Sequence, residues 1–482
     1  MKKKTIYSIF LILTILVYSC KLPDNIDPKN ASQVAPDAIF SGAMISLVNQ
    51  VGSINVNTNI SRLLAQYQAE VTYVTESRYN FSDRQIPDTY SGNLYRSVLM
   101  NLKDVKAQVA AKPETPSFPA GMKKNQLAMI EVLNVYTYQL LVDAFGNVPY
   151  TEALLGATNS RPKYDDAYTI YKDLIVRISQ AITDIDPNSD GFGSADLLYG
   201  GDASLWKKFA ATLKLRMGLR LADVAGSNSS TIVSQAVASG VFTDLTEGAV
   251  FNYLGVSPYV NSYYTEFVLT ARKDFCPTNT LVTLMNTLND PRRASWFTLY
   301  SGAYLGLTYG KQGASSYSKF SHFADNIRIN PSYPVILSDY VEAEFLLAEA
   351  AERGLGGVTN PATHYNNAIL ASMSYWGVAD ADAAAYLAQP GVAYATATGT
   401  YKQKIGTQKW LGLFDRGDEA WAEWRRLDFP ILTVPAAMTY ADIPVRMPYP
   451  FNENKMNKTN YDAAATAIGG DKASTKLFWD KN

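Results

Sequence analysis

Residues 202–221 read DASLWKKFAATLKLRMGLRL, and this stretch indicates the fold most clearly. Its apolar residues recur at three- and four-residue spacing: Trp206, Phe209, Leu213, Met217 and Leu221. Lys207, Lys208 and Lys214 take the other face, so the pattern predicts an α-helix that packs on one side. Either Asp202 or Ser204 is expected to cap its N-terminus.

The same helical spacing recurs along the chain, and the predicted helices come in neighbouring pairs. The helix at 121–144 ends where Gly146 and Pro149 interrupt it. The predicted pairs are 93–111 with 121–144, 165–185 with 204–223, 339–353 with 362–376, and 402–414 with 418–427. About four helical hairpins of this kind stack into a tetratricopeptide-like superhelical scaffold, although a strict 34-residue period is absent. The sequence therefore predicts an all-α fold.

The stretch from about 245 to 335 differs, because it lacks helical spacing and is rich in glycine, serine, asparagine and aromatic residues. A long loop-rich insertion in a helical scaffold is usually functional or disordered, and its aromatic content argues against disorder. We expect it to bind a ligand. The candidate contacts, for each of which simple loop packing is the alternative, are Tyr79, Tyr90, Tyr259, Tyr263, Tyr304 and Tyr309.

The N-terminus predicts export and lipidation. Three lysines precede an apolar run from Ile6 to Val17, and Ser19 and Cys20 follow it. The run is too short to span a bilayer, so residues 1–19 are interpreted as a signal peptide and Cys20 as the lipidated mature N-terminus. The alternative is an ordinary signal peptide with an incidental cysteine. Residues 20–35 are polar and predict a tether, and residues 36–482 are expected to form a single domain.

Composition excludes several function classes. A formal net charge of −1 gives no basic surface for nucleic acid. If Cys20 carries lipid, Cys276 is the only other cysteine, so an intrachain disulfide is not expected. The two histidines, His322 and His364, lie far apart and give little basis for a metal site or a catalytic triad. The 32 tyrosines, in contrast, suit the stacking of sugar rings.

One short segment resembles the start of a calcium-binding loop. Asp186, Asn188 and Asp190 stand at alternate positions before Gly191, as in loops that wrap a hard cation in oxygen ligands. The twelfth position is Leu197, so the bidentate acid is missing. A plain Asx-rich turn is the favoured interpretation. We expect no metal and no other cofactor.

Several local strings resemble the SusD/RagB family of outer-membrane nutrient-binding lipoproteins. Their order and spacing carry the resemblance more than any single string does. They are LLVDAFGNVPYTEA at 140–153, PKYD at 162–165, WKKF at 206–209, LKLR at 213–216, DPR at 290–292, EAEFLLAEA at 342–350, QKWL at 408–411, EAWAEWRR at 419–426 and RMPYP at 446–450.

The resemblance implies a tetratricopeptide scaffold, a loop-rich ligand-binding face and a TonB-dependent SusC-like transporter as partner. It further implies a cell-surface lipoprotein of the outer membrane in Bacteroidetes, which captures oligosaccharide and delivers it to that transporter without chemistry of its own. A peptide-binding, RagB-like member of the family is the alternative, and the richness in aromatic residues favours glycan. A surface glycoside hydrolase is a further alternative.

The matched strings also have a structural explanation. Glu342, Glu344 and Glu349 occupy helix positions that can pair with Arg216, Arg220 or Arg425 in partly buried contacts. A hydrolase would instead need two carboxylates facing each other across a cleft. Carboxylates inside scaffold helices are poorly placed for a cleft built from loops, so we expect these residues to be structural.

Overall fold

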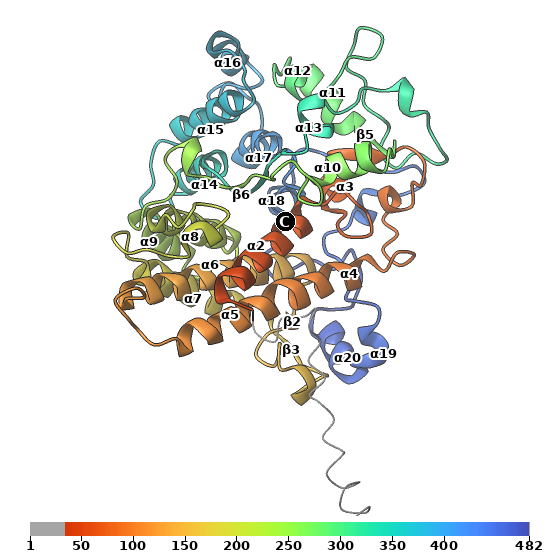
Figure 1. Cartoon of the computed structure of the whole chain (residues 1–482). Helices are drawn as coiled ribbons and strands as arrows, with labels where there is room; N and C mark the ends of the chain where they lie inside the picture. Colours follow the sequence, from red (N-terminus) through yellow and green to blue (C-terminus); the bar gives the residue numbers. More distant parts are fainter. Residues whose placement is uncertain (1–33, 482) are drawn as a thin grey trace, which may run out of the picture.

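The computed structural model describes residues 34–481, and this part of the chain is mainly helical (Figure 1). The predicted signal peptide and Cys20 lie outside the described residues, as does the predicted tether up to residue 33. The helices are α2 Pro36–Gly52, α3 Ser61–Leu64, α4 Ile86–Asn93, α5 Met100–Ala111, α6 Ala120–Phe145, α7 Ala167–Asp184, α8 Ala203–Arg220, α9 Ser229–Ala238, α10 Ser262–Tyr264, α11 Asn279–Thr287, α12 Arg293–Trp296, α13 Asp325–Arg328, α14 Tyr340–Glu352, α15 Pro361–Tyr375, α16 Asp380–Leu387, α17 Tyr401–Gly412, α18 Gly417–Leu427, α19 Glu453–Met456 and α20 Lys458–Ala467.

The predicted helical hairpins are confirmed. Helix α5 packs on α6, α7 on α8, α14 on α15, and α17 on α18. The predicted helix at 93–111 contains a π-helical stretch, Leu94–Leu99, before α5 begins. Further helices, among them α2 and α9, extend the stack, so the all-α fold class is confirmed with more helices than the four hairpins required.

Helix α8 shows how the scaffold is built. The Asp202 carboxylate accepts hydrogen bonds from the backbone N–H groups of Ser204 and Leu205 and so caps the helix. The prediction that Lys214 lies on an open face is wrong, because α9 covers that side of α8. Lys214 is buried, and its Nζ donates to Gln235 Oε1 at 2.8 Å.

Short antiparallel strands tie the loop-rich region to the scaffold. The described strands are β1 Gln68–Glu70, β2 Val148–Pro149, β3 Tyr164–Asp165, β4 Ala249–Phe251, β5 Phe275–Pro277 and β6 Val335–Ser338. They pair as β1 with β5, β2 with β3, and β4 with β6. Strands β4 and β6 stand at the two ends of the stretch from 245 to 335 and pair with each other, while β5 inside it pairs with β1. The stretch is therefore more regular than its sequence suggests.

The beginning and the end of the described chain pack together. Arg62 Nε in α3 lies 2.6 Å from Oδ1 of Asp415, which stands two residues before the start of α18. The Tyr67 hydroxyl donates to the Trp410 carbonyl oxygen at 2.5 Å, and Trp410 Nε1 donates to the Ala65 carbonyl oxygen at 3.0 Å. One hydrophobic core runs from α2 through α18. Within residues 34–481, none of the helices is long and apolar enough to cross a bilayer.

Candidate functional site

Three of the six tyrosines predicted to contact ligand are buried, which corrects that prediction. Tyr263 is only 1% exposed, and its hydroxyl donates to Asp415 Oδ1 at 2.7 Å. Tyr90 is equally buried, and its hydroxyl donates to Asp418 at 2.9 Å. The ring of Tyr309 is buried as well. A ring without an exposed face cannot stack on a sugar, so these three are part of the core.

The other three predicted tyrosines keep an exposed part, but the structure does not bring them together. Tyr259 is 49% exposed in the loop before α10. Tyr304 is half-buried, with the guanidinium carbon of Arg293 5.5 Å from its ring centroid. Tyr79 is half-buried against the ring of Tyr309, with 6.2 Å between the centroids. Among residues 34–481, no ring contact joins Tyr79, Tyr259 and Tyr304 to one another.

Three segments do meet on one surface, which we call the loop face: residues 71–79, 266–274 and 309–317. The Val71 N–H donates to the Asp274 carbonyl oxygen at 2.7 Å, and the Ser315 N–H donates to the Val71 carbonyl oxygen at 2.6 Å. Arg78 Nη1 donates to the Gly310 carbonyl oxygen at 2.9 Å. Backbone hydrogen bonds and the β1–β5 pair therefore fix this surface, as a binding surface on a scaffold requires.

The loop face presents aromatic rings beside charged groups. Tyr73 is 62% exposed, and the half-buried Tyr317 stacks on the imidazole of His322 at 3.8 Å between centroids. Arg272 Nε lies 2.5 Å from Asp274 Oδ2, and both side chains reach solvent. Aromatic faces with neighbouring charged hydrogen-bonding groups are what a saccharide site needs.

The prediction missed Tyr73 and Tyr317, because their local sequence hardly marks either of them as a ligand contact. Tyr73 stands between Thr72 and Val74 in a short segment, and Tyr317 is one of many aromatic residues in the stretch from 245 to 335. Exposure distinguishes them from the buried tyrosines, since contacts from distant segments decide which tyrosines stay exposed.

Burial also lowers the pKa of His322, so its ring is neutral at physiological pH and presents an uncharged face to Tyr317.

The glutamates of the matched strings form a buried charge network beneath the loops. Arg216 Nε lies 2.5 Å from Glu342 Oε1, and Arg416 also pairs with Glu342. Arg220 contacts Glu419 at 2.7 Å. The centre of the network consists of Glu342, Glu349, Glu419, Glu423, Arg216, Arg220, Lys409, Arg416 and Arg426, and Asp143, Asp339 and Arg353 join it at its edges. The expected pairing of Glu342 with Arg216 is confirmed.

For the other two glutamates, the expectation of pairing with Arg216, Arg220 or Arg425 is wrong. Glu349 pairs with Arg426 and Arg353, and with none of the three arginines expected for it. The Arg425 guanidinium stacks on the Trp421 ring at 3.7 Å and donates to the Asp143 carbonyl oxygen. Glu344 faces the other side of α14, where its Oε2 lies 2.8 Å from His364 Nδ1. Successive residues point to different sides of a helix, so small differences in packing decide which arginine is reached.

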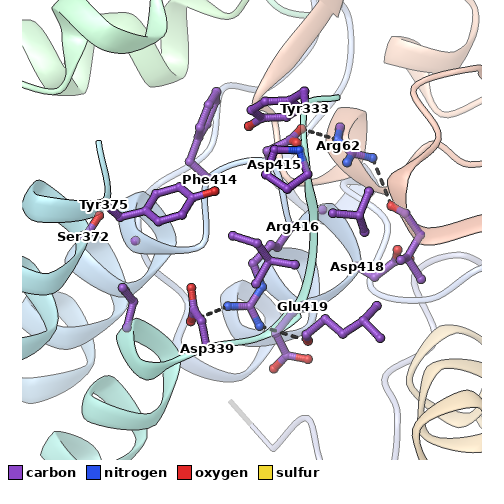
Figure 2. A pocket seen from close by; sticks show the side chains of 18 of the residues that line it. Arg62, Tyr333, Asp339, Ser372, Tyr375, Phe414, Asp415, Arg416, Asp418 and Glu419 are labelled. Atoms are coloured by element: carbon purple, nitrogen blue, oxygen red, sulfur yellow. Dashed lines mark hydrogen bonds and ion pairs between the residues drawn. The ribbon is translucent and has the colours of Figure 1, made fainter. Parts of the chain in front are cut away.

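A small pocket opens next to this network (Figure 2). Arg416 pairs with Asp339 at its floor, and Tyr333, Tyr375 and Phe414 line its walls. Its volume of about 40 Å³ has room for water molecules but not for a sugar ring. Burial raises the pKa of Glu342, but the charges of Arg216 and Arg416 outweigh burial and lower it to about 2. These carboxylates are paired and inaccessible, so the pocket is structural.

The segment that resembles a calcium loop is closed by the protein itself. The Asp186 carboxylate accepts from the Asn188 N–H and the Ser189 hydroxyl, each at 3.0 Å. Asn125 Nδ2 donates to the carbonyl oxygens of Asp186 at 2.9 Å and Ser189 at 2.7 Å, while Asp190 is exposed. This is the Asx-rich turn that the sequence favoured. Across the described chain, no three His, Cys, Asp or Glu side chains gather where they could hold a metal ion.

Comparison with known proteins identifies the family. The model of a SusD-like family described as "Starch-binding associating with outer membrane" matches residues 28–450. The chain therefore belongs to this SusD-like family, whose members bind ligands and lack catalytic activity. The expectation that the chain is not an enzyme is thereby confirmed, and the family's name associates it with the outer membrane. No curated protein matches the chain.

Solved structures share the fold. A SusD homologue from Bacteroides ovatus is 25% identical, covers 93% of this chain and 98% of its own, and superposes with a TM-score of 0.77. A chitin-binding SusD homologue from Flavobacterium johnsoniae is 23% identical, with 92% and 99% covered and a TM-score of 0.77. A SusD-like protein of the Bacteroidetes is 24% identical, with 93% and 100% covered and a TM-score of 0.80.

Proposed function

We propose that this protein is a cell-surface glycan-binding lipoprotein of the outer membrane, which captures oligosaccharide and delivers it to a TonB-dependent SusC-like transporter. The family match over residues 28–450 carries the proposal. The loop face supports it, because this surface offers exposed aromatic rings and charged groups on a scaffold fixed by backbone hydrogen bonds. Anchoring through Cys20 and partnership with the transporter are parts of the same proposal.

The proposed ligand contacts are Tyr73, Tyr79 and Tyr317 on the loop face. Tyr259 and Tyr304, which lie outside the three segments of the loop face, remain candidates, as the sequence predicts. The first ligand to test is a chitin oligosaccharide, since a relative of the same fold is described as chitin-binding. Each stacked ring should contribute on the order of 1 kcal/mol, by analogy with aromatic pairs.

Calorimetric titration with chitohexaose and maltoheptaose tests the proposal. Tyr73→Ala and Tyr317→Ala should each weaken binding by roughly fivefold to tenfold, because each removes a stacking ring. Tyr375→Ala is the matched control: Tyr375 is 37% exposed at the end of α15, beside the small structural pocket and outside the loop face, so its loss should leave affinity unchanged. Equal binding by all three variants would place the glycan site elsewhere. Binding of peptides and of no glycan would favour the RagB-like alternative.

A further inference from the structure

A second, larger cavity lies far from the loop face. It has a volume of about 660 Å³ and is bounded by α4, the segment from β2 to β3, and residues 449–456. Figure 1 shows β3 and α19 at the end of the molecule opposite α11 and α12. The volume falls in the range of about 300 to 1,000 Å³ typical of small-ligand pockets. Neither the charge network nor the loop face includes this cavity.

The walls of this cavity are apolar and partly open to solvent. Met100, Leu155 and Met456 are all exposed large hydrophobic residues, and Met456 is 67% exposed. They surround one cavity together with the half-buried rings of Tyr95 and Tyr164. Single exposed apolar residues need no explanation, but several around one concavity mark a binding site. Flexible methionines suit a ligand of variable shape.

Most polar groups of this cavity already have partners within the protein. The Asp88 carboxylate accepts from the backbone N–H groups of Phe451 at 2.8 Å and Asn452 at 2.9 Å. Glu453 accepts from the Tyr164 hydroxyl at 3.2 Å. These groups are therefore not available to bind the many hydroxyls of a sugar, so the cavity does not have the character of a second glycan site.

Two donors at the cavity remain without an acidic partner. The Tyr449 side chain is fully buried, and its hydroxyl has no hydrogen-bond partner in the described part of the protein. The guanidinium of Arg96 is exposed at the rim; its Nε donates to the Gly92 carbonyl oxygen at 3.1 Å, and no described carboxylate forms an ion pair with it. An orphaned buried hydroxyl is costly, and a cation beside an apolar cavity favours a ligand that carries an anionic end.

We propose that this cavity binds an amphiphile with an apolar chain and an anionic head group. The chain would cover Met100, Leu155 and Met456 and remove their surfaces from water, which is favourable in proportion to the apolar area buried. The head group would lie near Arg96, and a ligand oxygen would accept from the Tyr449 hydroxyl. This site is independent of the glycan-binding function proposed above.

Titration calorimetry with monomeric decanoate tests the proposal on the full-length chain. Decanoate should bind at one site, and decyltrimethylammonium, with the same chain length and a cationic head, should bind roughly tenfold more weakly. Arg96→Gln should abolish this preference, because it removes the charge at the rim. Dihexanoyl phosphatidylglycerol forms a third arm: tighter binding than decanoate would identify a membrane phospholipid as the source, and weaker binding would identify a free carboxylate.

The cavity wall is tested by Met456→Asp, which should weaken decanoate binding roughly tenfold or more. Val176→Asp is the control, because Val176 is 66% exposed on α7, outside the cavity. If a thermal melt shows that Met456→Asp is unfolded, Leu155→Asp is used in its place. Absence of saturable decanoate binding by the wild type, or equal binding by the wall variants and the control, would overturn the proposal. Capture of an apolar peptide without decanoate binding would also overturn it.

Discussion

Glu342 holds two guanidinium groups in the centre of the scaffold, and its loss should be costly. Glu342→Ala leaves Arg216 and Arg416 buried with too little negative charge around them. Removing one partner of a buried ion pair typically costs about 3 to 5 kcal/mol. We expect urea unfolding of the purified protein to show a loss of this size in the free energy of unfolding.

Exposed ion pairs provide the comparison for Glu342. Lys458 and Asp462 form a pair 2.8 Å apart at one turn's spacing on α20, and both side chains are more than half exposed. Asp462→Asn should change the free energy of unfolding by less than about 0.5 kcal/mol. If the two variants lose similar stability, the charge network does not support the fold in the way described.

Two buried carboxyl groups at the base of the loop face should make stability depend on pH. Glu70 lies beside Glu76 and accepts from the Ser77 N–H and hydroxyl, each at 2.7 Å. Burial, together with the neighbouring Glu76, raises the pKa of Glu70 to about 9. The folded state therefore keeps a proton that the unfolded state releases above about pH 4.3, so stability falls as the pH rises from there to about 9.

Glu70→Gln keeps an uncharged side chain at every pH and should remove this loss. The difference in free energy of unfolding between the variant and the wild type should grow in the variant's favour by up to about 1.4 kcal/mol for each pH unit between pH 5 and 9. Urea unfolding at pH 5.5, 7 and 8.5 measures the difference, in which the contributions of other titrating groups largely cancel. Parallel pH profiles for the two proteins would show that Glu70 ionises normally.

Which tyrosines stay exposed could not be predicted from local sequence. Tyr263 is covered because its hydroxyl reaches Asp415, 152 positions further along the chain. The hydroxyl of Tyr73 has no such partner within residues 34–481, and this side chain remains exposed. The aromatic content of the stretch from 245 to 335 indicated that aromatic rings would gather there. Only the packing of distant segments, however, separates tyrosines that can bind a ligand from tyrosines of the core. For this reason three of the six predicted contacts were wrong.

At the scale of elements, the cap of α8 gives a direct test of helix stability. Asp202→Ala removes the acceptor of two backbone N–H groups and should lower the free energy of unfolding by about 0.5 to 2 kcal/mol. Asp202→Asn keeps an acceptor oxygen and should recover most of the loss. Thermal or urea unfolding of both variants measures these changes in the free energy of unfolding. Equal losses of stability in the two variants would mean that the charge of Asp202, and not its capping hydrogen bonds, matters at this position.

The helical hairpins were predictable because the signals that specify them are local. Spacing of apolar residues indicates all of them. A capping carboxylate adds to this signal at α8 and α14, and a glycine at the end adds to it at α6 and α14. The short strands were not predictable, since β1 and β5 lie about 200 positions apart and pair over only three residues. The burial of Lys214 was missed for the same reason, because it depends on α9 as a second cover.

At the scale of the molecule, the proposed lipid anchor predicts where the protein is found. Cys20→Ala should leave a folded protein that is released from the membrane, because the anchor would be lipid and not a spanning helix. Cell fractionation followed by immunoblotting measures the release. The wild type expressed in the same strain, without the transporter, is the control. A variant that still sediments with the outer membrane in that strain would contradict lipidation at Cys20.

The contacts between the beginning and the end of the described chain determine the order of assembly. Arg62, Tyr67 and Ala65 find their partners only at Trp410 and Asp415, about 350 positions later. Closing so long a loop costs entropy before any contact repays it, and chains rich in such contacts fold slowly. The N-terminal segment therefore cannot reach its final packing until the hairpin of α17 and α18 has been synthesised. Such a delay keeps the N-terminal segment without its final packing for longer, and a segment that has not yet packed can still be threaded through a secretion channel.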